Sequence, residues 1–122
     1  MGAGGSRDAT KRPSMGRVVE RKADVVVVTS DNPRDENPAD IARQILEGFK
    51  SPERAWVVLD RREAIGRALS EARPGDTVLI AGKGHESSQV IGDHCYPFDD
   101  REVARGWLYD QEPEEISTAR WQ

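Results

Sequence analysis

The sequence predicts an α/β domain in which a mostly parallel sheet is flanked by helices. Two apolar, β-rich runs, at residues 25–29 and 77–81, each lead into a short polar segment. Helical patterns separate the predicted strands, and this alternation is typical of parallel strands joined by right-handed crossovers. In such sheets ligands bind just beyond the carboxyl ends of the strands. We therefore expect the polar segments 30–34 and 82–86 to lie side by side and to form a binding site.

The first half of the chain predicts a loop, a helix, a strand and a second helix. After the glycine-rich start, Pro13 is suited to open a helix that runs to about residue 22. The β-branched run at 25–29 has the pattern of a strand buried on both faces. Asn37 followed by Pro38 is a start signal for the next helix. The apolar stripes of the two helices are Met15, Val18 and Val19 in the first, and Ile41, Ile45, Leu46 and Phe49 in the second.

The second half of the chain predicts two further strand–helix units and a hairpin. Asp60 with Glu63 resembles a capping box, and Asp99 with Glu102 repeats this pattern at the last helix. The remaining predicted elements are strands over 55–59 and 77–81, a helix over 61–72, a hairpin over 89–97 that turns at Gly92-Asp93, and a last helix to about residue 109 that buries Val103, Trp107 and Leu108. The polar tail, residues 111–122, is expected to be frayed.

Composition limits the class of protein. The 122 residues carry a net charge of −4 and are 36% hydrophobic and 33% charged, which fits one small domain. Because no Lys/Arg stripe with interleaved aromatic residues is present, we expect no nucleic-acid partner. No run is apolar enough to span a bilayer, and the start lacks the apolar core of a signal peptide, so we expect a cytoplasmic protein without a membrane partner. The single cysteine, Cys95, predicts neither an internal disulfide nor a cysteine metal cluster.

Arg34 is the first candidate binding residue. A guanidinium holds a carboxylate through two parallel hydrogen bonds, which fixes both position and orientation. Pro33 stiffens the turn that presents this side chain, and the amide of Asn32 offers hydrogen bonds beside it. The alternative is a solvated arginine in a loop, paired with Asp35 or Glu36.

The segment 82–86, Gly-Lys-Gly-His-Glu, is the second candidate. It does not fit the phosphate-binding loop pattern G-x-x-x-x-G-K-[ST], so a full nucleotide site is not expected. Its two glycines allow close approach of a ligand to the backbone, and Glu86 is suited to accept hydrogen bonds from an ammonium group. Together with Arg34 this suits a small zwitterion such as an amino acid. The alternative is a glycine turn with exposed charges. The spacing of His94 and Cys95 predicts no metal site.

Several short blocks stand in order along the chain, at residues 2–8, 11–16, 29–34, 72–76, 81–86 and 97–102. Taken together, they resemble the C-terminal domain of the Mur ligases, and within this family the ligases that add diaminopimelate. The resemblance extends from residue 2 to about residue 108. It is specific because of the order of the blocks, since each block alone is a weak signal.

The resemblance implies a Rossmann-like domain over residues 1–110, followed by the polar tail at 111–122. Mur ligases of this kind use ATP to convert the terminal carboxylate of a UDP-MurNAc-dipeptide to an acyl phosphate, which the amine of meso-diaminopimelate attacks. The residues implied in binding diaminopimelate are Arg7, Asp31, Asn32, Pro33, Arg34, Gly82 and Glu86. Arg34 with Asn32 would hold the distal carboxylate, Glu86 the distal ammonium, and Arg7 the carboxylate near the attacking amine. No residue of the chain is implied as catalytic.

The resemblance also implies that the chain is a piece of a longer ligase. We expect the strand that opens the domain to be absent, together with the two preceding domains. ATP and Mg²⁺ would be needed by the full-length ligase, and the chain alone is expected to bind no cofactor fully and to catalyse no ligation. The UDP-MurNAc-dipeptide would bind through the preceding domains. Two alternatives stay open, a stand-alone module that binds diaminopimelate and an inactive remnant.

Overall fold

The computed structural model describes residues 1–110, and the predicted tail at 111–122 lies outside the described residues. The helices are α1 (Arg12–Lys22), α2 (Pro38–Leu46), α3 (Arg61–Glu71) and α4 (Asp100–Arg105), with 3₁₀ turns at Ala9–Lys11 and Pro52–Arg54 and a π-helical segment at Gly106–Asp110. The strands are β1 (Val27–Val28), β2 (Trp56–Val57), β3 (Ser88–Ile91) and β4 (His94–Pro97). In this part of the chain, no helix is both long and apolar enough to cross a bilayer.

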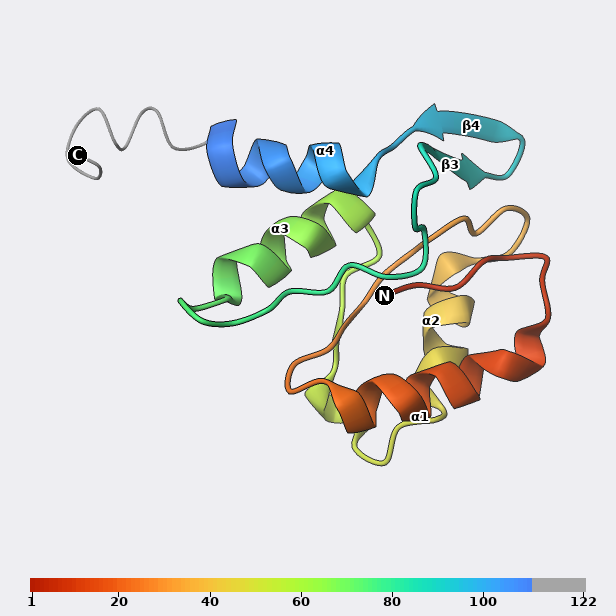
Figure 1. Ribbon diagram of the computed structural model, residues 1–122. Helices are drawn as coiled ribbons and strands as arrows, with labels where there is room; N and C mark the ends of the chain where they lie inside the picture. The colour runs from red at the N-terminus through yellow and green to blue at the C-terminus, as the bar shows by residue number, and fades with distance from the viewer. Residues whose placement is uncertain (111–122) are drawn as a thin grey trace, which may run out of the picture.

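These elements form an α/β arrangement with a small parallel sheet between two groups of helices. β1 and β2 pair in parallel, with Val27 opposite Trp56 and Val28 opposite Val57. Helices α1 and α2 pack against each other on one side of these strands, and α3 and α4 on the other (Figure 1). β3 and β4 form the predicted hairpin, which is antiparallel. The predicted α/β fold class is therefore confirmed.

The buried residues form two clusters, one in each group of helices. In the larger cluster, Val28 of β1 and Ile45 of α2 are completely buried. Its members are Ala3, Val26, Val28, Ile41, Ala42, Ile45 and Phe49, and those of the smaller cluster are Ile65, Phe98 and Val103. Full burial of one such aliphatic side chain stabilises the fold by about 1.5–3 kcal/mol. The first cluster thus holds β1 in place by its contacts with α2.

Three helices begin where the sequence predicts, because a carboxylate or amide oxygen accepts a hydrogen bond from a free backbone N–H of the first turn. These bonds are Asn37 Oδ1 with Ala39 N (2.9 Å), Asp60 Oδ1 with Glu63 N (3.1 Å) and Asp99 Oδ1 with Arg101 N (2.9 Å). Pro38 occupies the first position of α2, where its missing N–H costs no hydrogen bond. The capping signals therefore fix where α2, α3 and α4 begin.

The prediction of a strand over 77–81 is wrong, because the structure forms no strand there. This segment and residues Val25–Val27 both line one groove of about 660 Å³. A strand needs a neighbour that pairs with its N–H and C=O groups, and within the described residues the segment 77–81 joins neither sheet. Met1 pairs with the β1 side of the groove, since its nitrogen donates to Val27 O (2.9 Å) and its oxygen accepts from Thr29 N (2.9 Å). Leu79 is consequently 82% exposed.

Some expected burial also differs. Val25 is 61% exposed, so the run at 25–29 is not buried on both faces along its whole length. Val18 of α1 and Leu108 near the end of the described chain are 52% and 43% exposed, although both were expected to pack inward. The final turn changes from α-helix to π-helix at Gly106, which shifts the angular position of the residues that follow.

Replacement of Ile45 by alanine tests the larger cluster. Ile45→Ala removes buried methyl and methylene groups beside β1, and we expect the free energy of unfolding to fall by about 2–5 kcal/mol. Urea denaturation followed by circular dichroism measures this loss. Val18→Ala is the matched control, because its side chain is exposed, and it should change the free energy of unfolding by less than about 0.5 kcal/mol. Equal effects of the two substitutions would contradict the observed core.

Candidate functional site

The two predicted polar segments meet at the carboxyl end of β1. Lys83 joins them, since its Nζ lies 3.2 Å from Asp31 Oδ1 and 3.1 Å from Asn32 Oδ1. The same ammonium donates to Ser88 O at 2.6 Å, so the start of β3 is tied to the site as well. The expected proximity of segments 30–34 and 82–86 is therefore observed. Lys83 was not predicted as a site residue, because a lysine between two glycines usually indicates an exposed turn.

The backbone around Asp31 and Asn32 is held from two directions. Asp31, Asn32 and Pro33 are all buried. Gln89 Nε2 donates to Asp31 O at 2.7 Å from the hairpin, while Gly5 N donates to Asn32 O at 2.7 Å from the N-terminal loop. The loop after β1 is thus fixed by hydrogen bonds with segments far away in the sequence.

Arg34 is held in a left-handed backbone conformation, with φ at +51°. This conformation is uncommon for a residue with a side chain and persists where the surroundings fix it. Here Arg34 N donates to Val90 O (3.0 Å), and Arg34 O accepts from Gly92 N (2.6 Å). These bonds make an isolated parallel bridge between Arg34 and Ile91. The hairpin therefore determines the direction in which the half-buried Arg34 side chain points.

The guanidinium of Arg34 faces the N-terminal glycine loop. Its Nη1 donates to Gly5 O at 2.9 Å, and it makes no ion pair with Asp35 or Glu36 in the described chain. The alternative pairing of Arg34 with Asp35 or Glu36 is therefore not observed in the described chain. One hydrogen bond uses only part of the donor capacity of a guanidinium, so Arg34 retains donors for a ligand.

Glycine is required where the N-terminal loop passes the segment after β1. A Cβ at Gly5 would lie 1.8 Å from Pro33 O, which excludes any side chain at this position. At Gly4, a Cβ would lie 3.1 Å from Arg34 Nη1 and 3.4 Å from Arg7 Cγ. The exposed Arg7 and the half-buried Arg34 therefore flank Gly4, so two positive charges stand at this end of the site.

An ion pair between the buried Arg12 and the partly exposed Glu36 fixes the N-terminal loop. The Arg12 side chain is 1% exposed, and its two terminal nitrogens each lie 2.9 Å from an oxygen of Glu36. Ser6 N also donates to Glu36 (2.6 Å), and Arg12 donates to Gln44 Oε1 (2.7 Å) and Gly4 O (2.9 Å). The hydrogen bonds from Arg12 and Ser6 lower the pKa of Glu36 to about 2 and the carboxylate in turn raises the pKa of Arg12. This pair was not predicted from the sequence.

A second ion pair, which is buried, joins the segment after β1 to the end of segment 77–81. Arg61 Nε and Nη2 donate to the two oxygens of Asp100 at 2.8 Å each. The same guanidinium donates to Ser30 O (2.9 Å) and to Ala81 O (3.3 Å). Asp99 caps α4 as predicted, whereas Asp100 has a different role. Asp100 holds the arginine that positions both loops of the site.

Gly82 and Glu86 complete the second loop. Gly82 has φ at +116°, and a Cβ there would lie 2.9 Å from Gly2 O, so glycine is needed for conformation and for space. Glu86 N donates to Lys83 O at 3.2 Å in the following turn. Within residues 1–110 the Glu86 carboxylate is exposed and makes no hydrogen bond. The structure thus places Gly82 against Gly2, which packs on the backbone of residues 29–31, and places Arg7 and Arg34 on either side of Gly4, while the Glu86 side chain is not fixed against them.

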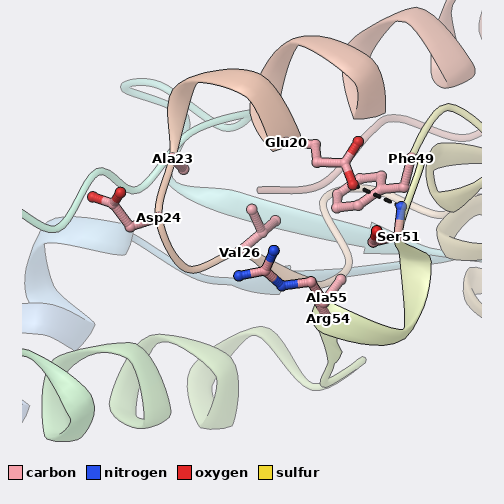
Figure 2. Close-up of a pocket in the computed structure, with 8 residues that line it drawn as sticks. All are labelled: Glu20, Ala23, Asp24, Val26, Phe49, Ser51, Arg54 and Ala55. Atoms are coloured by element: carbon pink, nitrogen blue, oxygen red, sulfur yellow. Dashed lines mark hydrogen bonds between the residues drawn. The ribbon is translucent and has the colours of Figure 1, made fainter.

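A small pocket of about 200 Å³ lies elsewhere, between the end of α1 and the turn before β2 (Figure 2). There Glu20 accepts hydrogen bonds from Lys50 N (2.8 Å) and Ser51 N (2.9 Å), which lowers its pKa. Val26 lies on the wall of this pocket, at the amino end of β1, so the pocket is separate from the candidate site. Among the described residues, no group of three or more His, Cys, Asp or Glu is placed to hold a metal ion.

Comparison with known proteins gives consistent matches. The family described as Mur ligase, glutamate ligase domain, matches residues 1–84. The chain is 53% identical over 112 residues to the UDP-N-acetylmuramoyl-L-alanyl-D-glutamate–2,6-diaminopimelate ligase of Caldanaerobacter subterraneus subsp. tengcongensis, covering 91% of this chain and 23% of that protein. It is 55% identical over 111 residues to the ligase of the same name in Thermosynechococcus vestitus, covering 90% and 22%. A solved structure of a ligase of this name is 40% identical, with a TM-score of 0.83 and coverage of 91% and 24%. The chain therefore spans about a quarter of the length of the relatives it matches.

The low pKa of Glu36 predicts how the pair with Arg12 responds to acid. Because the folded-state pKa lies near 2, below the ordinary 4.5, the pair stabilises the fold fully above about pH 4.5 and this contribution is lost as the pH falls through about 2. Carbon-13 NMR titration of the Glu36 carboxyl measures the midpoint. Arg12→Gln should raise the midpoint towards the ordinary value, whereas Arg17→Gln, on the exposed face of α1, should leave it unchanged. A wild-type midpoint near 4.5 would contradict the pairing.

Removal of the Asp100 charge tests the second pair. Asp100→Asn leaves the Arg61 guanidinium buried without its counter-charge, and we expect the free energy of unfolding to fall by about 3–5 kcal/mol. Chemical denaturation measures the loss. Asp40→Asn is the control, because Asp40 pairs with Arg43 at 3.4 Å on the surface and such pairs contribute about 0–1 kcal/mol. If Asp100→Asn is no more harmful than Asp40→Asn, the pair does not hold the two loops together.

Proposed function

The chain belongs to the Mur ligase family, and from this premise we propose that it binds meso-diaminopimelate as part of an ATP-dependent ligase of peptidoglycan synthesis. The amino acid would be joined to UDP-MurNAc-L-Ala-D-Glu by the whole ligase. The proposed binding domain comprises residues 1–110. This proposal rests on the family, on the names of the relatives and on the chemistry of the site. The cytoplasm is the location we propose for this reaction.

The observation that carries the proposal is the Arg34 guanidinium, which is held by Gly5 O and lies two residues along the chain from the buried Asn32. The left-handed backbone of Arg34 and its two bonds with the hairpin define the position of the side chain before a ligand arrives. Preorganised donors bind a carboxylate with a smaller loss of side-chain entropy than mobile ones do. Arg34 and Asn32 would hold the distal carboxylate of diaminopimelate, and Arg7 its other carboxylate.

Selection against lysine follows from the same geometry. Lysine lacks the distal carboxylate, so Arg34 and Asn32 would lose hydrogen bonds on binding it without a replacement. A site built to bind a polar group rejects an analogue that lacks this group strongly. Glu86, whose exposed carboxylate has no partner within residues 1–110, would accept the distal ammonium, which both amino acids carry.

Activation of the dipeptide carboxylate requires ATP and Mg²⁺ in this proposal. The described residues provide no metal-binding cluster, and the segment 82–86 does not fit a phosphate-binding loop. Residues 1–110 therefore do not fit these cofactors, and no step of phosphoryl transfer is assigned to them. We propose that the chain alone catalyses no ligation and that parts of the larger ligase supply the remaining chemistry.

Titration with meso-diaminopimelate and with L-lysine tests the proposed specificity. We expect the amide NMR signals of Asn32, Arg34, Gly82 and Glu86 to shift with diaminopimelate at concentrations at which lysine causes no change. Arg34→Met should weaken diaminopimelate binding about 10- to 100-fold, the range for loss of hydrogen bonds to a charged group. The control, Arg43→Met on the exposed face of α2, should bind as the wild type does. Equal binding of both amino acids would overturn the proposed specificity.

Complementation tests the assignment to a ligase. When the chain is mixed with the remaining domains of a diaminopimelate ligase, we expect ATP-dependent formation of the tripeptide product. The chain alone and the remaining domains alone should give none. Specific diaminopimelate binding without complementation would favour the stand-alone binding module instead.

A further inference from the structure

Lys83 is a buried cation whose hydrogen-bonding capacity is fully used inside the protein. Its side chain is 0% exposed. The three acceptors of its ammonium are Asp31 Oδ1 at 3.2 Å, Asn32 Oδ1 at 3.1 Å and Ser88 O at 2.6 Å. An ammonium has three N–H donors, so none remains for a ligand. Lys83 therefore acts on the site through the groups it holds.

The contacts of Asn32 define the orientation of its side-chain amide. Oδ1 accepts from Lys83 Nζ and also from Val90 N, at 2.9 Å. Both partners are donors without acceptor capacity, so the oxygen must be the atom that faces them. Rotation of the amide by half a turn would bring its NH₂ group against two donors. The position of the nitrogen is thus determined by the protein.

The side-chain nitrogen of Asn32 has no partner inside the protein. Within residues 1–110 it makes no hydrogen bond, and in the same part of the chain no fully buried side-chain nitrogen or oxygen lacks one. The Nδ2 group is therefore not completely enclosed, although Asn32 as a residue is only 5% exposed. What Asn32 offers to a ligand is two N–H donors and no acceptor.

We propose that Lys83 is a positioning residue that fixes Asn32 as a donor, so that Asn32 and Arg34 form a carboxylate-selective end of the site. This inference rests on the proposed function. It identifies the residue that decides whether Asn32 presents hydrogen-bond donors or an acceptor to the ligand. Lys83 has a second effect, because its charge compensates that of Asp31, whose side chain is 10% exposed. Without this compensation, a carboxylate of the ligand would meet the uncompensated negative charge of Asp31.

The orientation of Asn32 is tested first on the protein without ligand. Scalar coupling across hydrogen bonds, measured by NMR, should connect the Val90 amide nitrogen and the Lys83 ammonium to the Asn32 side-chain carbonyl carbon. The Asn32 NH₂ protons should exchange with water faster than those of a hydrogen-bonded amide. Absent couplings together with slowly exchanging NH₂ protons would overturn the proposal.

Two variants then separate positioning from folding. Asp31→Asn combined with Lys83→Met removes both charges together, and so leaves no buried charge unpaired. Asn32→Asp keeps an oxygen for Lys83 and Val90 but replaces the outward donors with an acceptor. Lys50→Met, an exposed lysine, is the matched control. Thermal unfolding first establishes that each variant is folded.

The decisive readout is the ratio of the dissociation constants for L-lysine and meso-diaminopimelate. We expect this ratio to fall by about tenfold or more in both site variants, the effect of one lost hydrogen bond to a charged group, and to stay unchanged in the control. Folded variants that keep the wild-type ratio would overturn the proposal, since a purely structural lysine alters stability without altering selectivity. If the wild-type chain binds neither amino acid, the proposed function fails, and the proposed selectivity fails with it. The scalar couplings still decide separately whether Lys83 fixes the orientation of Asn32.

Discussion

The buried guanidinium of Arg61 connects the segments that build the candidate site. It is paired with Asp100 at the start of α4 and donates to Ser30 O and Ala81 O, at the entrances of the two site loops. Burial of a charge is costly unless it is paired and hydrogen-bonded, and both conditions are met here. Because one rigid, planar group serves all these partners, the two loops cannot shift independently of each other or of α4.

Two further buried cations hold the segments around Arg61 in place. Arg12 ties the N-terminal glycine loop to Glu36, and Lys83 ties Asp31 and Asn32 to the start of β3. Each cation compensates a carboxylate, the partly exposed Glu36 in one case and the largely buried Asp31 in the other. The guanidinium groups of Arg7 and Arg34 are not used in these pairs, and such cations are suited to an anionic ligand group. The carboxylates of an amino acid fit this arrangement.

The local elements were largely predictable from the sequence. Asn37, Asp60 and Asp99 cap helices because each lies two or three residues before the N–H group that it binds. The turn at Gly92 closes the hairpin and likewise depends only on neighbouring residues. The segment 77–81 has an equally good strand pattern but forms no strand. A capping bond needs only neighbouring residues, whereas a strand needs a partner that its own sequence does not supply.

For the candidate site, the sequence by itself determined that two polar loops follow apolar runs, with Asn32 and Arg34 in one loop and Gly82 in the other. Only the tertiary structure decided which charges are buried and what they hold. Lys83, Arg12 and Arg61 look like surface residues in sequence, yet they bind partners 52, 24 and 39 positions away. Such pairs depend on how helices and loops pack, and a buried charge leaves no periodic pattern along the chain. The tertiary structure therefore determined which polar atoms of the candidate site are bound inside the protein and which are left without an internal partner.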